Sequence, residues 1–173
     1  IKHHVNRAGT ITHRLLGFSR KISAEYDVQV NEVLKETLSF LENEAHGNNI
    51  ALNLQLDENL PTIRTEGSQV QQVLLNLIEN ALDAVGSDGQ IDIITTRTKD
   101  ELHVQIADNG PGIKPEVMKK LWEPFFTTKE PGKGTGLGLS ICSDIAHKLG
   151  GTITAENRPQ GGAVFTLKLP LRG

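Results

Sequence analysis

Four alternating glycines near the end of the chain are the strongest candidate for chemistry in this sequence. The segment Gly132-Lys-Gly-Thr-Gly-Leu-Gly-Leu139 leads directly into a predicted helix. It combines a flexible loop and free backbone amides with the positive end of a helix dipole, and these features suit an anion. The glycines could instead act only as hinges. Their strict alternation before a helix favours a phosphate-binding loop.

The spacing differs from two common phosphate-binding motifs. Leu137 and Leu139 stand where GxGxxG would require a glycine, and Gly134 follows Lys133 where a P-loop has serine or threonine. Rossmann and P-loop folds are therefore disfavoured.

A second set of polar residues shares one face of a predicted helix, opposite its apolar residues. The set is Gln72, Asn76, Glu79, Asn80 and Asp83. This face could simply be solvated, but asparagine is a poor interior helix residue, and two at i and i+4 need an explanation. Asn76 and Asn80 can present neutral amide oxygens to an octahedral Mg²⁺ whose other ligands are water and nucleotide phosphates.

An acidic residue at the end of a predicted strand is the third candidate. It opens the segment Asp108-Asn-Gly-Pro-Gly-Ile113. Two glycines let this backbone approach a ligand closely, and a carboxylate can accept a hydrogen bond from an exocyclic amine. Taken alone, the segment is more typical of an ordinary turn.

Between these loops, Glu123-Pro-Phe-Phe-Thr-Thr-Lys129 joins two aromatic rings to two hydroxyls and a cation. The aromatic residues could simply pack the loop. The lysine could reach a terminal phosphate.

The apolar periodicity predicts the helices and strands that must position these segments. Helices are expected over residues 1–23, from an N-cap at Asn31 to Gly47, from Val70 to Gly86, and over 137–149. Strands are expected at 50–56, 62–65, 90–98, 101–107, 152–156 and 163–169, the first burying Ile50, Leu52, Leu54 and Leu56 on one face. Residues 24–30 are predicted to be a linker, and 108–138 an irregular functional loop with a short helix near 115–121.

The composition excludes several classes of protein. With 173 residues, 37% of them hydrophobic, the chain can form one ordinary core, and a net charge of −3 does not suit nucleic-acid binding. A single cysteine precludes an intrachain disulfide and favours a reducing compartment, and the six histidines lack zinc-ligand spacing. No apolar run approaches the roughly 20 residues that span a bilayer. We expect a cytoplasmic fragment without membrane contact; a membrane anchor in the full-length protein stays open.

Taken in this order, the four segments resemble the N, G1, F and G2 boxes of histidine kinases in the GHKL ATPase superfamily. The boxes are 74–84, 108–113, 123–129 and 132–139, and the resemblance covers about 29–170. It implies a two-layer α/β sandwich, the Bergerat-type ATP-binding fold, with a mixed sheet carrying helices on one face, plus an N-terminal helix. Residues 29–173 would be the ATP-binding catalytic domain, with a lid over about 109–135. Residues 1–28 would be the second helix of a dimerisation and phosphoacceptor hairpin with its linker, closest in register to nitrogen-regulation kinases.

The resemblance also implies ATP and Mg²⁺ as cofactors and a role for each site residue. Asp108 would accept from the adenine amine, Asn80 would bind the metal, and Asn76 and Lys129 would be catalytic. The implied nucleotide contacts are Asn76, Asn80, Asp83, Asp108, Gly110, Gly112, Ile113, Phe126, Thr128, Lys129, Lys133, Gly134, Thr135, Gly136, Leu137, Gly138 and, through water, Thr166.

The implied activity is transfer of the γ-phosphate to a histidine in two-component signalling. The implied partners are a second copy, joined through the hairpin, and the receiver domain of a response regulator. A phosphoacceptor histidine typically precedes an acidic residue, and none of His3, His4, His13, His46, His103 and His147 does so. We therefore expect the acceptor helix to lie outside this chain.

Three alternatives to a histidine kinase stay open. GHKL hydrolases such as gyrase carry a glutamate four residues before the magnesium asparagine; Asn76 stands there and cannot take a proton from water. A non-catalytic nucleotide-binding module is disfavoured because every box is intact. A serine-directed anti-sigma kinase fits the boxes, but the hairpin-like helix over residues 1–23 argues against it.

Overall fold

The computed structural model describes residues 24–171, and the predicted helix over residues 1–23 lies outside this range. Within the described residues, five strands form a sheet in the order β2-β4-β5-β7-β6, with β2 parallel to β4 and the other neighbours antiparallel. The strands are β2 (Ala51–Gln55), β4 (Gln90–Arg97), β5 (Glu101–Asp108), β6 (Thr152–Asn157) and β7 (Ala163–Pro170).

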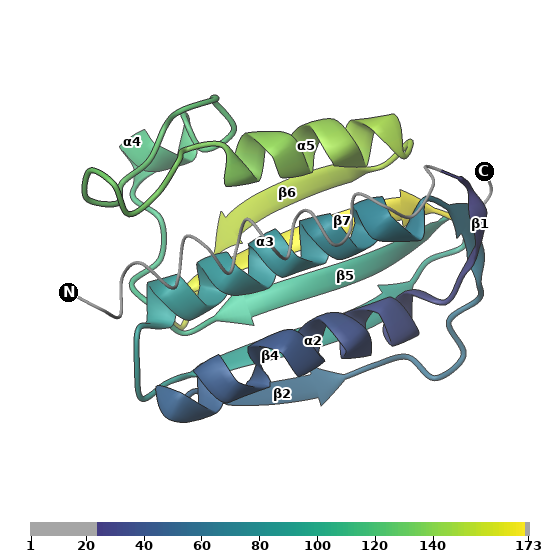
Figure 1. Cartoon of the computed structure of the whole chain (residues 1–173), viewed down its shortest axis with the longest axis horizontal. Coiled ribbons are helices and arrows are strands. Elements are labelled where there is room, and N and C mark those ends of the chain that lie inside the picture. The colour runs from purple at the N-terminus through teal and green to yellow at the C-terminus, as the bar shows by residue number, and fades with distance from the viewer. Residues whose placement is uncertain (1–23, 172–173) are drawn as a thin grey trace.

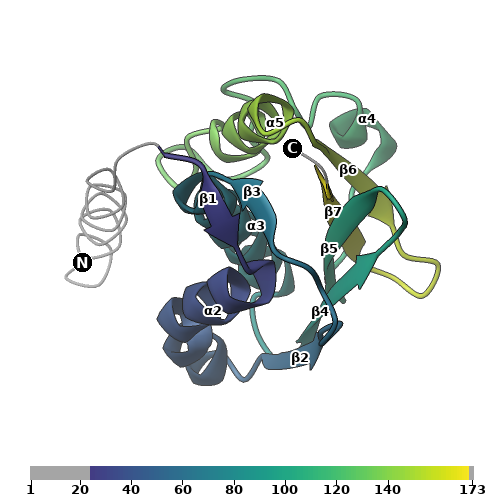
Figure 2. The ribbon, with the colours of Figure 1, turned by 90° about the vertical axis from the view of Figure 1, so that its right-hand side faces the viewer.

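Three helices, α2 (Val30–Gly47), α3 (Gly67–Val85) and α5 (Gly138–Lys148), cover one face of this sheet, as Figure 2 shows. The α/β sandwich with a mixed sheet is thereby confirmed. The short helix α4 (Pro115–Met118) lies in the lid beyond one end of α5 (Figure 1) and ends three residues earlier than predicted.

The central helix α3 positions the N box because its apolar face packs on the middle of the sheet. Val70, Leu74, Leu77 and Ile78 are fully buried. The same holds for the facing sheet residues Ile93, Val104, Ile106 and Leu167. Gly86 ends the helix with a φ of 75°, a conformation that glycine adopts without strain. The polar face of α3 is therefore held in a fixed direction.

A second, two-stranded sheet was not expected. Tyr26–Val28 (β1) pairs antiparallel with Ile63–Thr65 (β3), although residues 24–30 were predicted to be a linker. The prediction was wrong here because a three-residue strand is stabilised by its distant partner and has no periodicity of its own. Residues 26–28 therefore pack with the segment that precedes α3.

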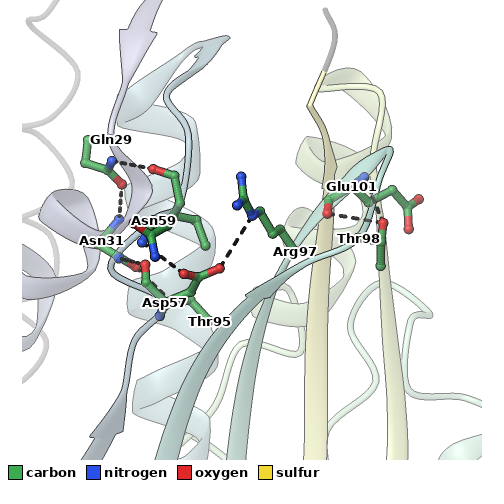
Figure 3. Close-up of polar contacts among 9 residues, drawn as sticks. Gln29, Asn31, Asp57, Asn59, Thr95, Arg97, Thr98 and Glu101 are labelled. Atoms are coloured by element: carbon green, nitrogen blue, oxygen red, sulfur yellow. Dashed lines mark hydrogen bonds and ion pairs between the residues drawn. The ribbon is translucent and has the colours of Figure 1, made fainter.

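The N-terminus of α2 also differs from the prediction. Gln29 is the N-cap, and its side-chain oxygen accepts from the amide of Asn31 at 3.2 Å. Asn31, the predicted cap, is buried; its side chain donates to the carbonyl oxygen of Asp57 at 2.9 Å and accepts from the hydroxyl of Thr95 at 3.0 Å. Figure 3 shows this cluster, in which Arg97 lies 3.8 Å from the Asp57 carboxylate. It joins the start of α2 to β4 and to the loop before β3.

The first predicted strand has only part of its expected buried face. Ile50 is buried and Leu52 and Leu56 are partly buried, but Leu54 is 46% exposed. The prediction was wrong for Leu54 because β2 is an edge strand, which the helices cover only in part. Among residues 24–171, no helix is both long and apolar enough to cross a bilayer.

Candidate nucleotide-binding site

Asp108 is the last residue of β5 and is 1% exposed. Its Oδ1 accepts from the amide of Gly110 at 2.9 Å and from the amide of Ala163 at 3.4 Å. Burial raises the pKa of the Asp108 carboxyl, while these two bonds and the charge of Arg158 act in the opposite direction. In the part of the chain that the structure describes, the amide bonds all go to Oδ1, which leaves Oδ2 for a ligand.

The rest of the G1 box is held by contacts at both ends. A Cβ atom at Gly110 would lie 2.7 Å from the carbonyl oxygen of Ala84, so only glycine lets this loop pass so close to the end of α3. At the other end, Ile113 donates to Oδ1 of Asn157 at 2.7 Å, and Nδ2 of Asn157 donates back to the Ile113 carbonyl oxygen at 2.7 Å. Gly112, between them, has a φ of 78°.

Asn76 and Asn80 lie half-buried on the polar face of α3, as predicted. Nδ2 of Asn76 lies 3.5 Å from Sγ of Cys142, a fully buried residue of α5. Burial raises the pKa of this thiol to about 12, so Cys142 stays protonated and neutral. The contact orients the amide of Asn76, whose oxygen is left for another partner.

The residues of the site fit a magnesium ion that would take most of its ligands from nucleotide and water. The described residues contain no cluster of three or more His, Cys, Asp or Glu side chains that could hold a metal. No hydrogen bond within residues 24–171 engages the side-chain amide of Asn80. One amide oxygen on a rigid helix suits Mg²⁺, which keeps several waters and takes its remaining ligands from phosphates.

Both lysines predicted to reach phosphate are paired with acids in this structure. Lys129 of the F box forms an ion pair with Asp83 of α3, and Lys133 lies 2.6 Å from Glu130. Phosphate oxygens would have to replace these carboxylates. The contact between Lys129 and Asp83 joins the lid to the N box, so two of the predicted boxes are adjacent in space.

The G2 box packs against the F box at the start of α5. A side chain at Gly136 would overlap the backbone of Phe125, and one at Gly134 would lie 3.0 Å from Oγ1 of Thr127. Among the described residues, no side chain caps α5, so its first amides are available to an anion. The amide of Leu137 donates to Oγ1 of Thr135 at 3.2 Å, so a phosphate oxygen would have to replace this hydroxyl. Phe126 and Thr128 lie in the same lid, half-buried and exposed respectively.

Thr166 does not join this group. It pairs with Gln105, three residues from Asp108 on β5, and side chains an odd number of residues apart on a strand point to opposite sheet faces. Thr166 therefore faces away from the helices and from Asp108. The β7 residue that contacts Asp108 is Ala163, so the predicted adenine contact of Thr166 is dropped.

The glycine-rich lid gives the first prediction. Residues 134–138 should exchange their amide hydrogens rapidly without nucleotide and at least about tenfold more slowly with it, because phosphate contacts must offset the high conformational entropy of glycine. Hydrogen exchange with and without ADP measures this, and α3 serves as the internal control. Equal protection in both states would contradict an ATP lid.

Comparison with known proteins identifies the family. Residues 65–173 match the family model described as histidine kinase-, DNA gyrase B- and HSP90-like ATPase, which covers more than half of the chain. The chain belongs to this family. Sensor histidine kinase ZraS of Klebsiella oxytoca is 35% identical over 170 residues, a region that is 97% of this chain and 36% of that protein. The chain thus carries the ATPase domain of sensor histidine kinases and spans about a third of the length of this relative.

Solved structures of histidine kinases agree with this assignment. The catalytic domain of histidine kinase ThkA superposes with a TM-score of 0.79 at 34% identity, covering 86% of this chain and 99% of that domain. A second structure, of ThkA in complex with response regulator protein TrrA, covers 98% of this chain and 49% of that chain, with a TM-score of 0.77 and 30% identity. The nitrogen-regulation subtype is not distinguished by these matches and stays a prediction.

Three residues of the ATPase site were missed by sequence reasoning. Asn157 and Arg158 lie at the end of β6, outside every box, and Cys142 was considered only for disulfides. Their roles depend on contacts with residues at least 44 positions away, so no local pattern could have shown them.

Proposed function

We propose that this domain binds Mg-ATP and donates the γ-phosphate to a histidine on the first helix of a dimerisation hairpin. The observation that carries the proposal is that the buried Asp108 and the uncapped start of α5 lie at the same end of the sheet. The helix α5 and the strand β6 are consecutive, joined by a turn at residues 149–151, so α5 begins where β6 ends. That end of β6 contacts the G1 box through Asn157.

A nucleotide would join these two groups in one orientation. Adenine would meet the carboxylate of Asp108, and the phosphates would meet the amides of Gly134, Gly136 and Gly138. The polar face of α3 lies between them, where Asn80 would hold Mg²⁺. When bound, the metal would screen the phosphate charge, and Lys129 would add a cation after leaving Asp83.

Phosphotransfer is favoured over hydrolysis by the residue at the position of a general base. Asn76 is neutral and its amide is oriented by Cys142, so it cannot take a proton from an attacking water. An imidazole attacks directly and needs only an oriented nucleotide and screened charge. The domain therefore supplies the donor half of the reaction.

The remaining parts of the proposal concern the whole protein. We infer a dimer formed through a hairpin that includes residues 1–28, and a response regulator as the phosphate acceptor from histidine. The described complex of ThkA with TrrA supports such a partner. A cytoplasmic location fits the free, buried thiol of Cys142.

The test is reconstitution of the two halves. Alone, this chain should bind Mg-ATP, hydrolyse it slowly and fail to acquire label from γ-labelled ATP. Addition of the cognate first hairpin helix, fused upstream or within a separate dimerisation domain, should restore acid-labile label on the added histidine. The physical reason is that the hairpin must deliver the imidazole in line with the γ-phosphorus.

Two other results would support different functions. Rapid hydrolysis without an acceptor would favour a GHKL hydrolase, and acid-stable label on serine would favour an anti-sigma kinase. A fused acceptor carrying histidine-to-glutamine is the matched control, because it keeps the hairpin and removes only the nucleophile.

A further inference from the structure

A half-buried arginine lies behind the adenine end of the site. Arg158, in the turn after β6, has a side chain only 14% exposed. Its Nη1 donates to the main-chain carbonyl oxygen of Asp108 at 3.1 Å, and its Nη2 lies 3.3 Å from Oδ2 of Asp92. Asp92, on β4, has a side chain 15% exposed. With its amide oxygen turned toward the guanidinium, Gln160 accepts from Nε at 3.2 Å and Nη2 at 2.9 Å.

The whole turn after β6 packs on the G1 box. The amide of Arg158 donates to the carbonyl oxygen of Gly162 at 2.8 Å, and a side chain at Gly162 would overlap the main chain of Asp108. Asn157, the preceding residue, holds Ile113 by two hydrogen bonds. One turn therefore fixes both ends of the segment 108–113, and Arg158 fixes the end that carries the carboxylate.

We propose that Arg158 is a positioning residue for adenine recognition: by joining the carbonyl oxygen of Asp108 to the carboxylate of Asp92, it fixes the direction in which the Asp108 side chain meets the base. This inference rests on the proposed function, in which Asp108 accepts from the adenine amine. Arg158 itself lies behind the β5 backbone and acts only through Asp108.

The guanidinium also acts on the charge of Asp108. Only the ionised carboxylate can accept from the amine without also presenting a proton, and the charge of Arg158 lowers the pKa of this carboxyl against the effect of burial. The other neighbouring strand residues are apolar: Ile91 of β4 is opposite Asp108, and Ala163 of β7 contacts it. On α3, whose end faces Gly110, the nearest acid in sequence is Asp83, already paired with Lys129.

The two effects can be separated because arginine and lysine differ in geometry more than in charge. The planar guanidinium reaches Asp108 and Asp92 at once, whereas an ammonium is a point charge with one position. Arg158→Lys therefore keeps most of the charge and loses the connection. Arg158→Gln loses both.

The experiment measures ADP affinity by calorimetry between about pH 5 and pH 8, with the unaltered domain and three variants. Arg97→Gln is the control. Arg97 is an arginine of β4 that, like Arg158, pairs with an aspartate, but its partner Asp57 lies at the opposite end of the sheet. The protonation state of ADP changes with pH in the same way in the experiments with all four proteins. The ratio of each dissociation constant to that of the unaltered domain therefore reports only the protein.

For Arg158→Gln, the ratio should exceed that of Arg97→Gln at pH 8 and should rise further toward pH 5, because loss of the opposite charge moves the pKa of Asp108 upward. For Arg158→Lys, the ratio should stay above one but change little with pH.

Three outcomes would overturn the proposal: a ratio for Arg158→Gln equal to that of Arg97→Gln at every pH, a ratio that does not change with pH, or full rescue by lysine. Failure of Arg158→Gln to fold, seen by circular dichroism, leaves the comparison of Arg158→Lys with Arg97→Gln to decide. Failure of the unaltered domain to bind ADP at any pH would instead contradict the proposed function.

Discussion

Replacing Asp108 with asparagine is expected to reduce ATP affinity by more than about tenfold without reducing the stability of the fold. Asparagine keeps an oxygen at the Oδ1 position, so the amides of Gly110 and Ala163 stay satisfied. Its NH₂ group then stands at the position of Oδ2, where it meets the adenine amine donor to donor. Loss of a hydrogen bond to a charged group costs about 1.5 to 3 kcal/mol, which corresponds to the expected fall in affinity.

The effect on stability follows from the pKa of Asp108. Because folding raises this pKa, the folded state binds more protons than the unfolded state between the two pKa values. The contribution of Asp108 to the free energy of unfolding therefore falls as pH rises through that interval. Asparagine has no such titration. The free energy of unfolding of Asp108→Asn should therefore equal or exceed that of the unaltered domain at neutral pH.

Calorimetry of ATP binding and urea unfolding at neutral pH together test this prediction. A parallel loss of affinity and stability would show that Asp108 supports the fold and does not bind the adenine base. Unchanged affinity would remove the adenine assignment altogether.

Replacing Asn80 with alanine should weaken Mg-ATP binding by about tenfold or more and metal-free ATP by much less. Only the magnesium complex is expected to use the side-chain oxygen. The expectation is strengthened by the structure, in which no hydrogen bond among residues 24–171 engages this amide, so its removal leaves no buried group unpaired. Asn80→Asp should instead change which divalent ion is preferred, since it adds a charge to the same position.

Affinities measured in magnesium and in chelator give the result as a ratio. Gln72→Ala is the matched control, because Gln72 lies half-buried on the same face of α3 two turns earlier. Equal losses for Asn80→Ala in both buffers would mean that Asn80 contacts the nucleotide or the lid in place of the metal.

Much of this domain was determined by local sequence. The apolar face of α3, the alternation in β4 and β5 and the glycine that ends each long helix could be predicted because side chains a few positions apart create those patterns. The four boxes could also be recognised locally, since each lies within about eleven consecutive residues. The sequence alone therefore determined most helices and strands, the order of the four boxes along the chain and the family.

The tertiary structure decided what depends on residues far apart in the chain. The pairing of β1 with β3, the burial of Asn31 against Thr95 and the face to which Thr166 points all follow from strand register, which a short strand does not encode by itself. The contact between Lys129 and Asp83 joins two boxes 46 residues apart. The bond from Arg158 to Asp108 spans 50 residues. Such contacts form only after the sheet brings distant strand ends together. The chemistry of each site residue is therefore set by its type in the sequence, whereas its contact partners are set by the fold.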